Sequence, residues 1–501
     1  MTAVQRDAHT VIMASFAGPV VPAWIPAAIR AGLGSVCLFG SNLTGDDAEL
    51  RALTDTLHDP PSADLAGVVV AIDEEGGDVT RLDARRGSAL PSPAALGRVD
   101  DVALTRAVAA GLARRLRAAG IDLDLAPVAD VDADPRNPVI GVRSYGADPQ
   151  LVARHVAVVV TELQRGGVAA CAKHFPGHGA TAQDSHLTLP EVDAPLSTLM
   201  RRELPPFRAA VAAGVEAVMS GHLLVPALDP TGPASTSAAV TDVLRRDLGF
   251  EGVLVTDALD MDGVSGPRGH GSLPAAAVAG LRAGADLLCL RPDVTAEGFD
   301  AVVAAVVAAV ADGSLPRERL AEAAARVRAL AARAAARRLP VVAEPAAPAV
   351  AEVVAAEVVA AEVARRAVAL EGEPPSIEGA LVVRLKGTPN IAVGEVPWGL
   401  ADVADGRLPG ACHVDAGPAA DAVELLGRAA GRPLGAVVRD VARAPWAWSL
   451  LTALAAGRPD LVVVDLGRPS PEPLPGAAVV RTFGSGRTAA AAAVDVLVGV
   501  R

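Results

Sequence analysis

The chain has 501 residues and a formal net charge of −13 at neutral pH. Hydrophobic residues make up 51% of it and aromatic residues only 2%, so its apolar mass is Ala, Val and Leu, which suits helices packed on buried parallel strands. This length favours more than one domain, and the acidic balance argues against nucleic-acid and anionic-membrane partners, which bind basic surfaces.

The cysteines Cys37, Cys171, Cys289 and Cys412 lack the pairing typical of a metal site or a disulfide framework, so we expect small buried side chains. The N-terminus begins polar and carries Asp7 before its first apolar run, which is atypical of a signal peptide. No uncharged apolar run reaches the roughly 18 residues of a membrane span. We therefore expect a soluble cytoplasmic protein, and we expect it to be a monomer.

Short apolar runs alternate with longer segments of helical period up to about residue 340. Runs that are nearly continuous in Val, Ala and Leu predict buried parallel strands at 34–40, 67–73, 121–128, 167–173, 215–221, 252–258 and 285–290. An eighth run, 11–16, is a more ambiguous candidate for a strand. Segments between the runs, such as 102–120 and 273–285, end near Gly and predict helices. The alternation predicts a (β/α)8 barrel over residues 1–340, with a doubly wound open sheet as the alternative.

The remainder of the chain predicts a second domain. A long Ala/Arg-rich helix is expected over 315–339, and the Pro- and Ala-rich stretch that follows predicts a linker at 341–350. Residues 351–501 again alternate in pattern, with apolar runs at 380–385, 411–416, 435–441, 460–467 and 477–484. These runs predict a smaller α/β domain with a mainly parallel sheet.

Polar side chains follow several of the predicted barrel strands at the point where each strand ends. In a barrel, the carboxyl ends of all strands lie on one face, where active sites are built. The residues placed there are Asp73, Glu74 and Glu75 after the second clear strand, Asp130 and Asp132 after the third, Lys173 and His174 after the fourth, His222 after the fifth and Asp257 after the sixth.

The segment AKHFPGHGATAQDSHLTLP, residues 172–190, gathers three of the nine histidines. Metal binding is one interpretation, since His174 and His178 are four residues apart. Pro176 and Gly177 between them argue against the helix that would bring both to one face, and no second carboxylate stands close by. We therefore expect no metal and no other cofactor.

Acid–base chemistry is the stronger interpretation of this segment. Asp184 and His186 are two residues apart, so the carboxylate can hydrogen-bond the imidazole, fix its tautomer and raise its basicity. Asp257 follows the apolar run VLVT, and a carboxylate at a barrel mouth can attack a sugar anomeric carbon while a separate acid protonates the leaving oxygen. Asp260 and Asp262 lie further along and are expected to be solvated.

Longer motifs resemble the bacterial β-N-acetylglucosaminidases of glycoside hydrolase family 3. KHFPGHG, four residues and then DSH resemble the signature of that branch, and AIDEEGGDVTRL resembles its IDQEGGRVQRL. The stretches 34–43, 125–149 and 235–261 are similar to further landmarks in the same order. The resemblance covers essentially the whole first domain, and the second domain fits the two-domain members.

The resemblance implies a retaining double displacement. Asp257 would be the nucleophile, and His186, oriented by Asp184, would be the general acid and then the general base in place of the usual second carboxylate. Sugar hydroxyls would be bound by the side chains of Asp73, Arg81, Arg143, Lys173 and His174. His178 would hold its loop together, and His222 would line or support the pocket.

The sequence departs from the family pattern at positions that flank the expected pocket. Asp78 stands where the family often has Arg, MSGHLL replaces a commoner MTAH, and the segment after Met261 contains extra Gly and His270. The motif thus predicts a β-N-acetylglucosaminidase acting on muropeptides or short GlcNAc oligosaccharides, with phosphate as an alternative acceptor. The other readings are a β-glucosidase or a phosphorylase of the same family, a sugar-binding protein without catalysis, and a metal hydrolase.

Overall fold

The computed structural model describes residues 1–60, 66–266, 269–338, 350–388, 391–404 and 406–500. The chain forms two compact units. The barrel unit comprises Met1–Glu74, Thr105–Asn137 and Ala147–Ala356, and the C-terminal unit comprises Glu75–Leu104, Pro138–Gly146 and Glu357–Arg501. Most of the predicted linker, residues 341–349, lies outside the described residues, so the predicted domain boundaries stay a prediction.

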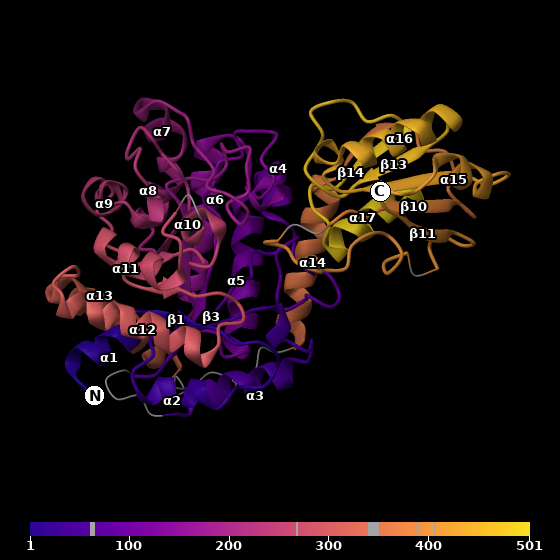
Figure 1. The fold of residues 1–501 in the computed structure, drawn as a ribbon. Coiled ribbons are helices and arrows are strands. Elements are labelled where there is room, and N and C mark those ends of the chain that lie inside the picture. The colour runs from indigo at the N-terminus through magenta and orange to yellow at the C-terminus, as the bar shows by residue number, and fades with distance from the viewer. Residues whose placement is uncertain (61–65, 267–268, 339–349, 389–390, 405, 501) are drawn as a thin grey trace. The chain divides into compact units, whose positions relative to one another are not determined.

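The barrel unit is built on an eight-stranded parallel sheet in the order β7-β6-β5-β4-β3-β2-β1-β8 (Figure 1). Its outermost strands meet through a parallel bridge between Val255 and Leu287, so the sheet nearly closes on itself. This closure confirms the predicted barrel over the open-sheet alternative. The strands are β1 (Ile12–Ala14), β2 (Ser35–Leu38), β3 (Val69–Ile72), β4 (Leu123–Asp124), β5 (Ala169–Phe175), β6 (Ala217–Ser220), β7 (Val253–Thr256) and β8 (Leu288–Cys289).

Alternate residues of these strands form one apolar core, because successive side chains of a strand point to opposite faces. Val69 and Ala71 of β3 and Val253 and Val255 of β7 belong to it, as do three of the cysteines. Cys37, Cys171 and Cys289 are buried, as predicted, whereas Cys412 is exposed.

Helices surround the strands of the barrel unit (Figure 1). Gly284, at φ 112°, ends α11 in the left-handed conformation that glycine adopts most easily. The helices of this unit are α1 (Ala3–Thr10), α2 (Trp24–Arg30), α3 (Asp47–His58), α5 (Val102–Ala118), α6 (Pro149–Arg165), α7 (Leu196–Arg202), α8 (Leu204–Ala212), α9 (Ala238–Asp242), α10 (Asp262–Ser265), α11 (Leu273–Ala283), α12 (Ala296–Ala311) and α13 (Arg317–Arg338). The first residues of α5, up to Leu104, belong to the C-terminal unit.

The C-terminal unit contains a six-stranded sheet in the order β11-β10-β12-β13-β14-β9. Five strands are parallel and β9 is antiparallel to β14, which confirms a mainly parallel sheet and adds an edge strand that the apolar runs did not indicate. The strands are β9 (Ala369–Gly372), β10 (Leu381–Leu385), β11 (Cys412–Ala416), β12 (Leu434–Val438), β13 (Val462–Asp465) and β14 (Ala478–Arg481). The helices are α4 (Pro93–Val99), α14 (Val350–Ala367), α15 (Ala422–Arg428), α16 (Pro445–Gly457) and α17 (Arg487–Leu497), and the first residues of α14, up to Ala356, belong to the barrel unit.

The two faces of this second sheet pack into separate apolar clusters. Leu381 and Val383 of β10 lie in a cluster with residues of α15 and α16, while Val382, between them, packs with residues of α17. Continuous apolar strands covered on both faces are typical of parallel sheets.

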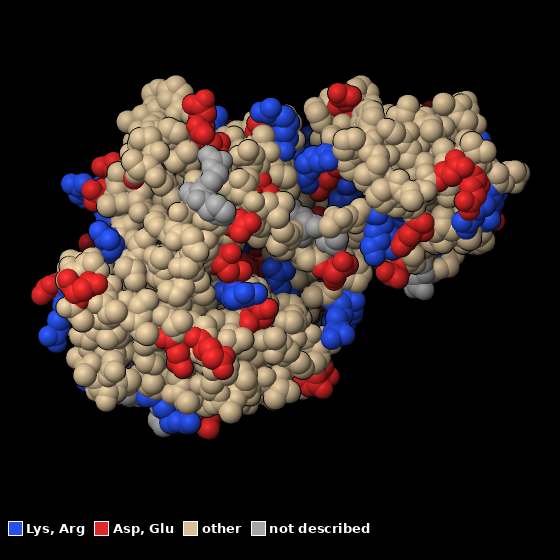
Figure 2. Space-filling view, in the orientation of Figure 1, with Lys and Arg blue, Asp and Glu red and all other residues tan. Residues whose placement is uncertain are grey.

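Charged side chains of both signs are interspersed over the face drawn in Figure 2. On this face the Lys and Arg side chains do not form the extended basic cluster that is typical of nucleic-acid-binding surfaces. Within the described ranges, every helix is too short or too polar to cross a lipid bilayer.

Candidate active site

The polar residues predicted at strand ends lie where parallel strands place them. Lys173 and His174 lie near the carboxyl end of β5, Asp73 directly follows β3, and Asp257 directly follows β7. The register between β5 and β6 shifts between Lys173 and Phe175, and the Lys173–His174 peptide bond is cis. Because each of them lies at or directly after the carboxyl end of its strand, these residues share the carboxyl-end face of the barrel, where active sites of such barrels are built.

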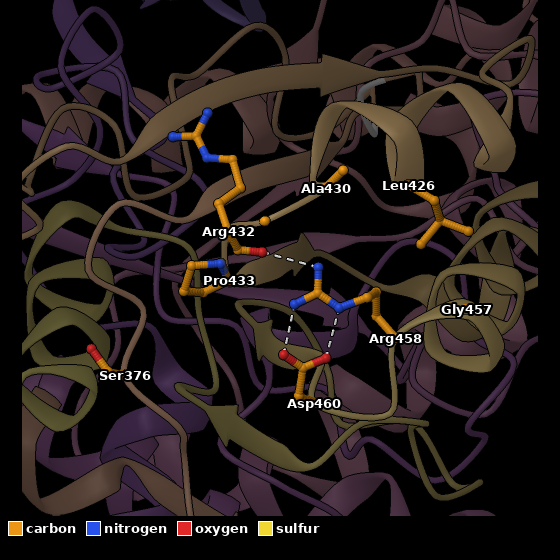
Figure 3. A pocket seen from close by; sticks show the side chains of 9 residues that line it. Ser376, Leu426, Ala430, Arg432, Pro433, Gly457, Arg458 and Asp460 are labelled. Atoms are coloured by element: carbon orange, nitrogen blue, oxygen red, sulfur yellow. Dashed lines mark hydrogen bonds and ion pairs between the residues drawn. The ribbon is translucent and has the colours of Figure 1, made fainter.

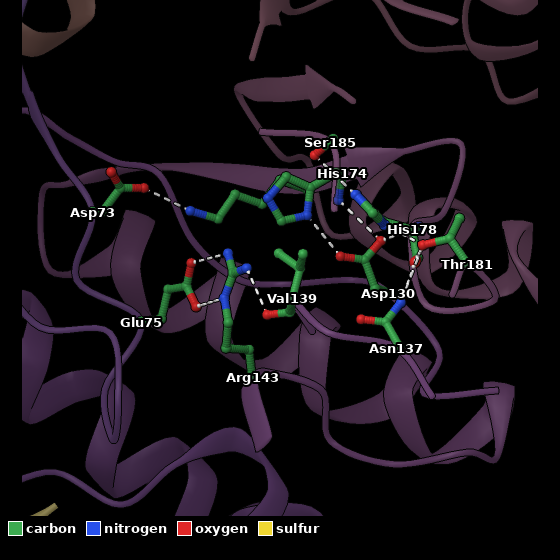
Figure 4. Close-up of polar contacts among 11 residues, drawn as sticks. Asp73, Glu75, Asp130, Asn137, Val139, Arg143, His174, His178, Thr181 and Ser185 are labelled. Atoms are coloured by element: carbon green, nitrogen blue, oxygen red, sulfur yellow. Dashed lines mark hydrogen bonds and ion pairs between the residues drawn. The ribbon is translucent and has the colours of Figure 1, made fainter. Parts of the chain in front are cut away.

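Lys173 and Asp73 form an ion pair across this face. The Lys173 Nζ lies 2.6 Å from Asp73 Oδ1, and the side chains are 3% and 16% exposed (Figure 4). A short charge-assisted contact of this kind fixes both side chains in one orientation. The pair thus presents an ammonium and a carboxylate, a combination suited to hydroxyl groups that both donate and accept.

The Asp130 carboxylate accepts hydrogen bonds from both histidines of the KHFPGHG motif. Its Oδ2 accepts from His174 Nδ1 at 2.7 Å, and its Oδ1 accepts from the backbone N–H of His178 at 2.7 Å (Figure 4). Burial would raise the pKa of Asp130, but the charges and hydrogen bonds of His174 and His178 outweigh it and lower the pKa. Since an ionised carboxylate only accepts, Nδ1 of His174 carries a proton.

His178 braces the loop, as expected from the motif. Its Nδ1 contacts the Thr181 hydroxyl at 2.9 Å, its Nε2 contacts the Ser185 hydroxyl at 3.0 Å, and the side chain is buried. Asn137 ties the same turn by donating to the His178 carbonyl at 2.8 Å. Burial lowers the pKa of His178 to about 4, so the imidazole is neutral at physiological pH.

Residues 177–188, called here the acid–base arm, carry the predicted dyad. Asp184 Oδ1 accepts from His186 Nδ1 at 2.7 Å and from the His186 backbone N–H at 2.9 Å. Burial would raise the pKa of Asp184, but the hydrogen bonds and charge of His186 overcome it and lower the pKa. The carboxylate therefore fixes a proton on Nδ1 of His186, which leaves Nε2 as the ring nitrogen for the predicted proton exchange.

The acid–base arm is attached to the segment that follows Asp257. The Gly263 backbone N–H donates to the Ser185 carbonyl at 3.2 Å. A Cβ on Gly263 would lie 2.9 Å from that oxygen and 3.1 Å from the Thr188 carbonyl, so only glycine allows this approach. The contact fixes the distance between the dyad and the loop that carries the nucleophile candidate.

Backbone hydrogen bonds position Asp257, and nearby imidazoles lower its pKa. Its N–H donates to Ser220 of β6 at 2.9 Å, and its Oδ1 accepts from the Ala258 N–H at 2.8 Å. Burial would raise its pKa, but His174, His222 and His186, together with the Ala258 N–H, lower the pKa to about 2. Asp257 is thus ionised at neutral pH, as a nucleophile must be.

Asp260 and Asp262, which follow Asp257 in the chain, differ in their exposure to solvent. Asp262 is exposed, as expected, but Asp260 is partly buried, and its Oδ1 is shielded from solvent. Burial raises the pKa of Asp260. The expectation that both are solvated was therefore wrong for Asp260, because the turn after β7 folds its side chain inward.

His222 supports the loop of Asp257. Its Nε2–H donates to the Ala258 carbonyl at 3.0 Å, and its Nδ1 accepts from the Ser235 hydroxyl at 2.7 Å. Burial lowers the pKa of this fully buried imidazole. Since both ring nitrogens have protein partners, the geometry favours a positioning role, and a direct contact with sugar stays a prediction.

The two predicted arginines lie in the C-terminal unit as defined above. Arg143 forms a fork with Glu75, with Nε–Oε2 2.8 Å and Nη2–Oε1 2.7 Å, and donates to the Val139 carbonyl at 3.2 Å (Figure 4). Arg81 donates to the Ala392 carbonyl at 3.0 Å. Glu75 therefore orients Arg143, and the sugar contacts of both arginines stay predictions.

The chemistry available to this arrangement is nucleophilic attack combined with proton transfer. An ionised carboxylate and a carboxylate-oriented imidazole are the two functions that a retaining glycosidase requires. Across the part of the chain that the structure describes, no three His, Cys, Asp or Glu side chains are arranged to hold a metal ion.

Comparison with known families identifies this fold and site together. Residues 27–330 match the model of the glycosyl hydrolase family 3 N-terminal domain. The chain belongs to glycoside hydrolase family 3. The match covers most of the barrel unit, including the KHFPGHG motif, the dyad and Asp257.

Relatives of this family 3 glycoside hydrolase include proteins named β-hexosaminidase. One from Neisseria meningitidis serogroup C is 39% identical over 275 residues, which cover 53% of this chain and 73% of that protein. One from Chromobacterium violaceum is 38% identical over 283 residues, 55% and 75% of the two chains. A family 3 β-N-acetylglucosaminidase structure from Paenibacillus sp. str. FPU-7 is 30% identical with a TM-score of 0.87, covering 100% of this chain and 97% of that one.

Two functional carboxylates of this family 3 glycoside hydrolase received no role from sequence reasoning. Asp130 holds His174 and His178, and Glu75 holds Arg143. Both were visible as acidic residues after predicted strands. Their roles depend on contacts with residues 44 and 68 positions away, which local patterns do not reveal.

Proposed function

We propose that this family 3 enzyme is a retaining exo-β-N-acetylglucosaminidase that removes terminal β-linked GlcNAc from muropeptides or short oligosaccharides. The observation that carries the proposal is the pairing of the Asp184–His186 dyad with an ionised Asp257 in one unit. The β-hexosaminidase names of relatives and the named activity of the Paenibacillus enzyme agree with it. The cytoplasmic location and monomeric state stay predictions.

In the first step, an Asp257 carboxylate oxygen attacks the anomeric carbon of the terminal sugar. The bond between that carbon and the aglycone oxygen breaks, and His186 Nε2–H delivers its proton to the departing oxygen. The product is a glycosyl ester on Asp257 and a neutral His186, whose Nδ1–H still donates to Asp184.

In the second step, the neutral His186 accepts a proton from water at Nε2. The water oxygen attacks the anomeric carbon, the ester bond breaks, and Asp257 is released as a carboxylate. Two inversions give net retention of configuration. Asp184 takes part in both steps by stabilising the imidazolium before attack and by keeping the proton-exchanging nitrogen outward.

Recognition of the sugar rests on charged groups in fixed positions. Lys173, Asp73 and His174 Nε2 offer donors and acceptors to ring hydroxyls, and the Lys173–Asp73 and His174–Asp130 contacts hold them in place. An epimer would leave one of these buried groups without a hydrogen bond, which is costly.

The test is a comparison of p-nitrophenyl β-GlcNAc with p-nitrophenyl β-glucoside, with and without inorganic phosphate. We expect GlcNAc release of the β anomer as the first product, without a requirement for phosphate. Preferential glucose release would assign the enzyme to the glucosidases. Formation of GlcNAc 1-phosphate at the expense of GlcNAc would assign it to the phosphorylases.

Two controls complete the assay. EDTA treatment should leave the rate unchanged, since no step uses a metal ion, and a loss of activity would contradict the mechanism. Cleavage must also disappear in Asp257→Asn protein, which excludes a contaminating hydrolase as the source of the signal.

A further inference from the structure

A buried glutamate of the barrel unit, Glu203, has no role in the proposed mechanism. It lies where α7 ends and α8 begins, and only 1% of it is exposed. Its backbone N–H donates to the Leu199 carbonyl at 2.9 Å, so the last turn of α7 fixes its position. A carboxyl group in such a place is costly unless its oxygens are bonded or it carries a proton.

The two carboxyl oxygens of Glu203 have different surroundings. Oε1 accepts from Nε of the partly exposed Arg202 at 2.5 Å. Oε2 is shielded from solvent and has no hydrogen-bond partner among the described residues. Only half of this carboxyl group is therefore matched by a donor.

A fully matched carboxylate of the C-terminal unit shows the difference. Asp460 lines a hollow of about 560 Å³ and accepts from Arg458 through both oxygens, with Oδ1–Nε 2.8 Å and Oδ2–Nη2 2.7 Å (Figure 3). These two bonds stabilise the charged form and lower the pKa of Asp460. Glu203 has only one such bond, and burial raises its pKa to about 7 in spite of the Arg202 charge.

The unmatched oxygen of Glu203 faces Gly177, the first residue of the acid–base arm. A Cβ on Gly177 would lie 2.6 Å from Oε2 and 2.8 Å from the Glu203 Cβ, closer than such atoms approach in folded proteins. Gly177 also has φ 132°, a conformation that favours glycine. Its N–H donates to the His174 carbonyl at 2.8 Å, so the turn that joins β5 to the arm packs directly against the Glu203 side chain.

The charges around this turn limit the ionisation of Glu203. The Arg202 guanidinium of α7 lowers the pKa of Glu203, and the Asp130 carboxylate of the loop after β4 raises it. The titratable groups of the turn itself, His174 and His178, both donate to Asp130. Ionisation of Glu203 would therefore place a second negative charge in a buried turn whose donors Asp130 already uses.

We propose that Glu203 is a positioning residue of the acid–base arm, which supports the turn at Gly177 in its protonated form and displaces that turn when it ionises. The inference rests on the proposed function, because it concerns the arm that carries His186. Loss of the proton leaves a buried charge, and the turn relieves its cost by moving apart and admitting water. His186 then leaves the position that proton transfer requires, and a shift of about 1 Å can cost about a hundredfold in rate.

The experiment compares wild type with Glu203→Gln, whose side chain keeps the shape of the neutral acid and cannot ionise. Turnover of p-nitrophenyl β-GlcNAc is measured from pH 6 to pH 9, and dividing kcat of the variant by kcat of wild type cancels the titration of His186. We expect this ratio to lie within about twofold of one at pH 6 and to rise about tenfold by pH 9, with a midpoint near pH 7. Glu251→Gln, which changes an exposed glutamate before β7, is the matched control and should follow wild type throughout.

A second measurement needs no catalysis. The pKa of Glu203 is about 7 in the folded protein and about 4.5 otherwise, so the folded protein binds the extra proton and stability is lost as pH rises from 4.5 towards 7. Between pH 5 and pH 8, the melting temperature of wild type should therefore fall by a few degrees more than that of Glu203→Gln. Equal changes in the two proteins would refute the buried proton and the inference with it.

The outcomes separate the inference from the function on which it rests. If the kcat ratio stays constant from pH 6 to pH 9, Glu203 has a structural role at most, and the inference is refuted while the activity stands. If Glu203→Gln does not fold, the wild-type profile decides: with this good leaving group we expect the second step, which needs neutral His186, to limit the rate, so a kcat that does not fall between pH 7 and pH 9 refutes the inference. If no GlcNAc glycoside is cleaved at any pH, the proposed function fails first, and the inference fails with it.

Discussion

The Asp184→Asn substitution removes one negative charge from the acid–base arm and keeps the shape of the side chain. In the structure, one oxygen of Asp184 accepts both the ring Nδ1–H and the backbone N–H of His186, at 2.7 and 2.9 Å. An amide oxygen can accept the same two bonds. The substitution therefore tests the charge that stabilises the imidazolium, and tests the geometry of the arm much less.

The magnitude follows from the strength and exposure of this contact. A hydrogen bond to a charged group contributes about 1.5–3 kcal/mol, and partial exposure screens it. The side chains of His186 and Asp184 are 22% and 15% exposed, so we take the lower part of that range, about 1.5–2 kcal/mol. At about 1.4 kcal/mol for each tenfold change in rate, kcat should fall about 10- to 30-fold.

The assay separates the two steps of the reaction. Asp184→Asn should lose most activity on glycosides with poor leaving groups, because p-nitrophenolate departs with little help from an acid. With p-nitrophenyl β-GlcNAc, whose leaving group departs easily, we expect the second step to limit the rate of the variant, and azide should restore turnover because it attacks without a base. Gln183→Ala changes an exposed neighbour on the same arm and should behave as wild type. The reasoning would be refuted by an equal loss on all leaving groups without azide rescue.

Three further predictions concern Asp257, the acid–base arm and His178. Asp257→Asn should lower kcat at least about a thousandfold with an unchanged melting temperature, whereas Asp262→Asn, an exposed carboxylate nearby, should retain activity. Gly263→Ala places a methyl group against carbonyl oxygens of the arm, so kcat should fall about tenfold to a hundredfold while the fold persists; full activity would show that the arm is not positioned there. The pKa of His178 is about 4 in the folded protein and about 6.5 otherwise, so the unfolded chain binds the extra proton and stability is lost as pH falls from 6.5 towards 4. Burial also raises the pKa of Glu203 to about 7, so protonation of Glu203 stabilises the folded protein as the pH falls and opposes the effect of His178. The test therefore compares wild type with His178→Gln. From pH 7 to pH 5, the unfolding free energy of wild type should fall by about 2 kcal/mol more than that of the variant.

Most of the fold could be predicted because buried parallel strands leave a strong local signal. The run 11–16 was ambiguous only in isolation, and the structure confirms it as β1, which pairs with both β2 and β8. The edge strand β9 left no such signal, since Ala369–Gly372 is partly or fully exposed and becomes a strand only by pairing with β14. The assignment of residues 75–104 and 138–146 to the C-terminal unit was equally invisible, because it depends on long-range contacts.

The sequence predicts the main candidate residues of the site but not the residues that position them. Asp184 and His186 are close in sequence, so their hydrogen bond follows from local geometry. Asp130 and Ser235 act on histidines 44 and 13 residues away, and no spacing rule connects them. Asp257 stood out only as a polar residue after an apolar strand, and its low pKa depends on three imidazoles, one from β5 and two from loops elsewhere in the chain.

The distribution of charge is consistent with the proposal that a histidine, His186, is the proton donor. Asp73, Asp130 and Asp184 each have a cationic or imidazole partner at 2.6–2.7 Å, whereas Asp257 is held by a backbone N–H and by the field of His174, His222 and His186. Asp257, the proposed nucleophile, is thus kept ionised without a tight salt bridge that attack would have to break. A carboxylic acid in place of His186 would leave one more negative charge after proton transfer, and like charges at short distance raise one another's pKa. A neutral imidazole avoids this repulsion, so in the proposed second step water can be deprotonated beside the regenerating carboxylate of Asp257.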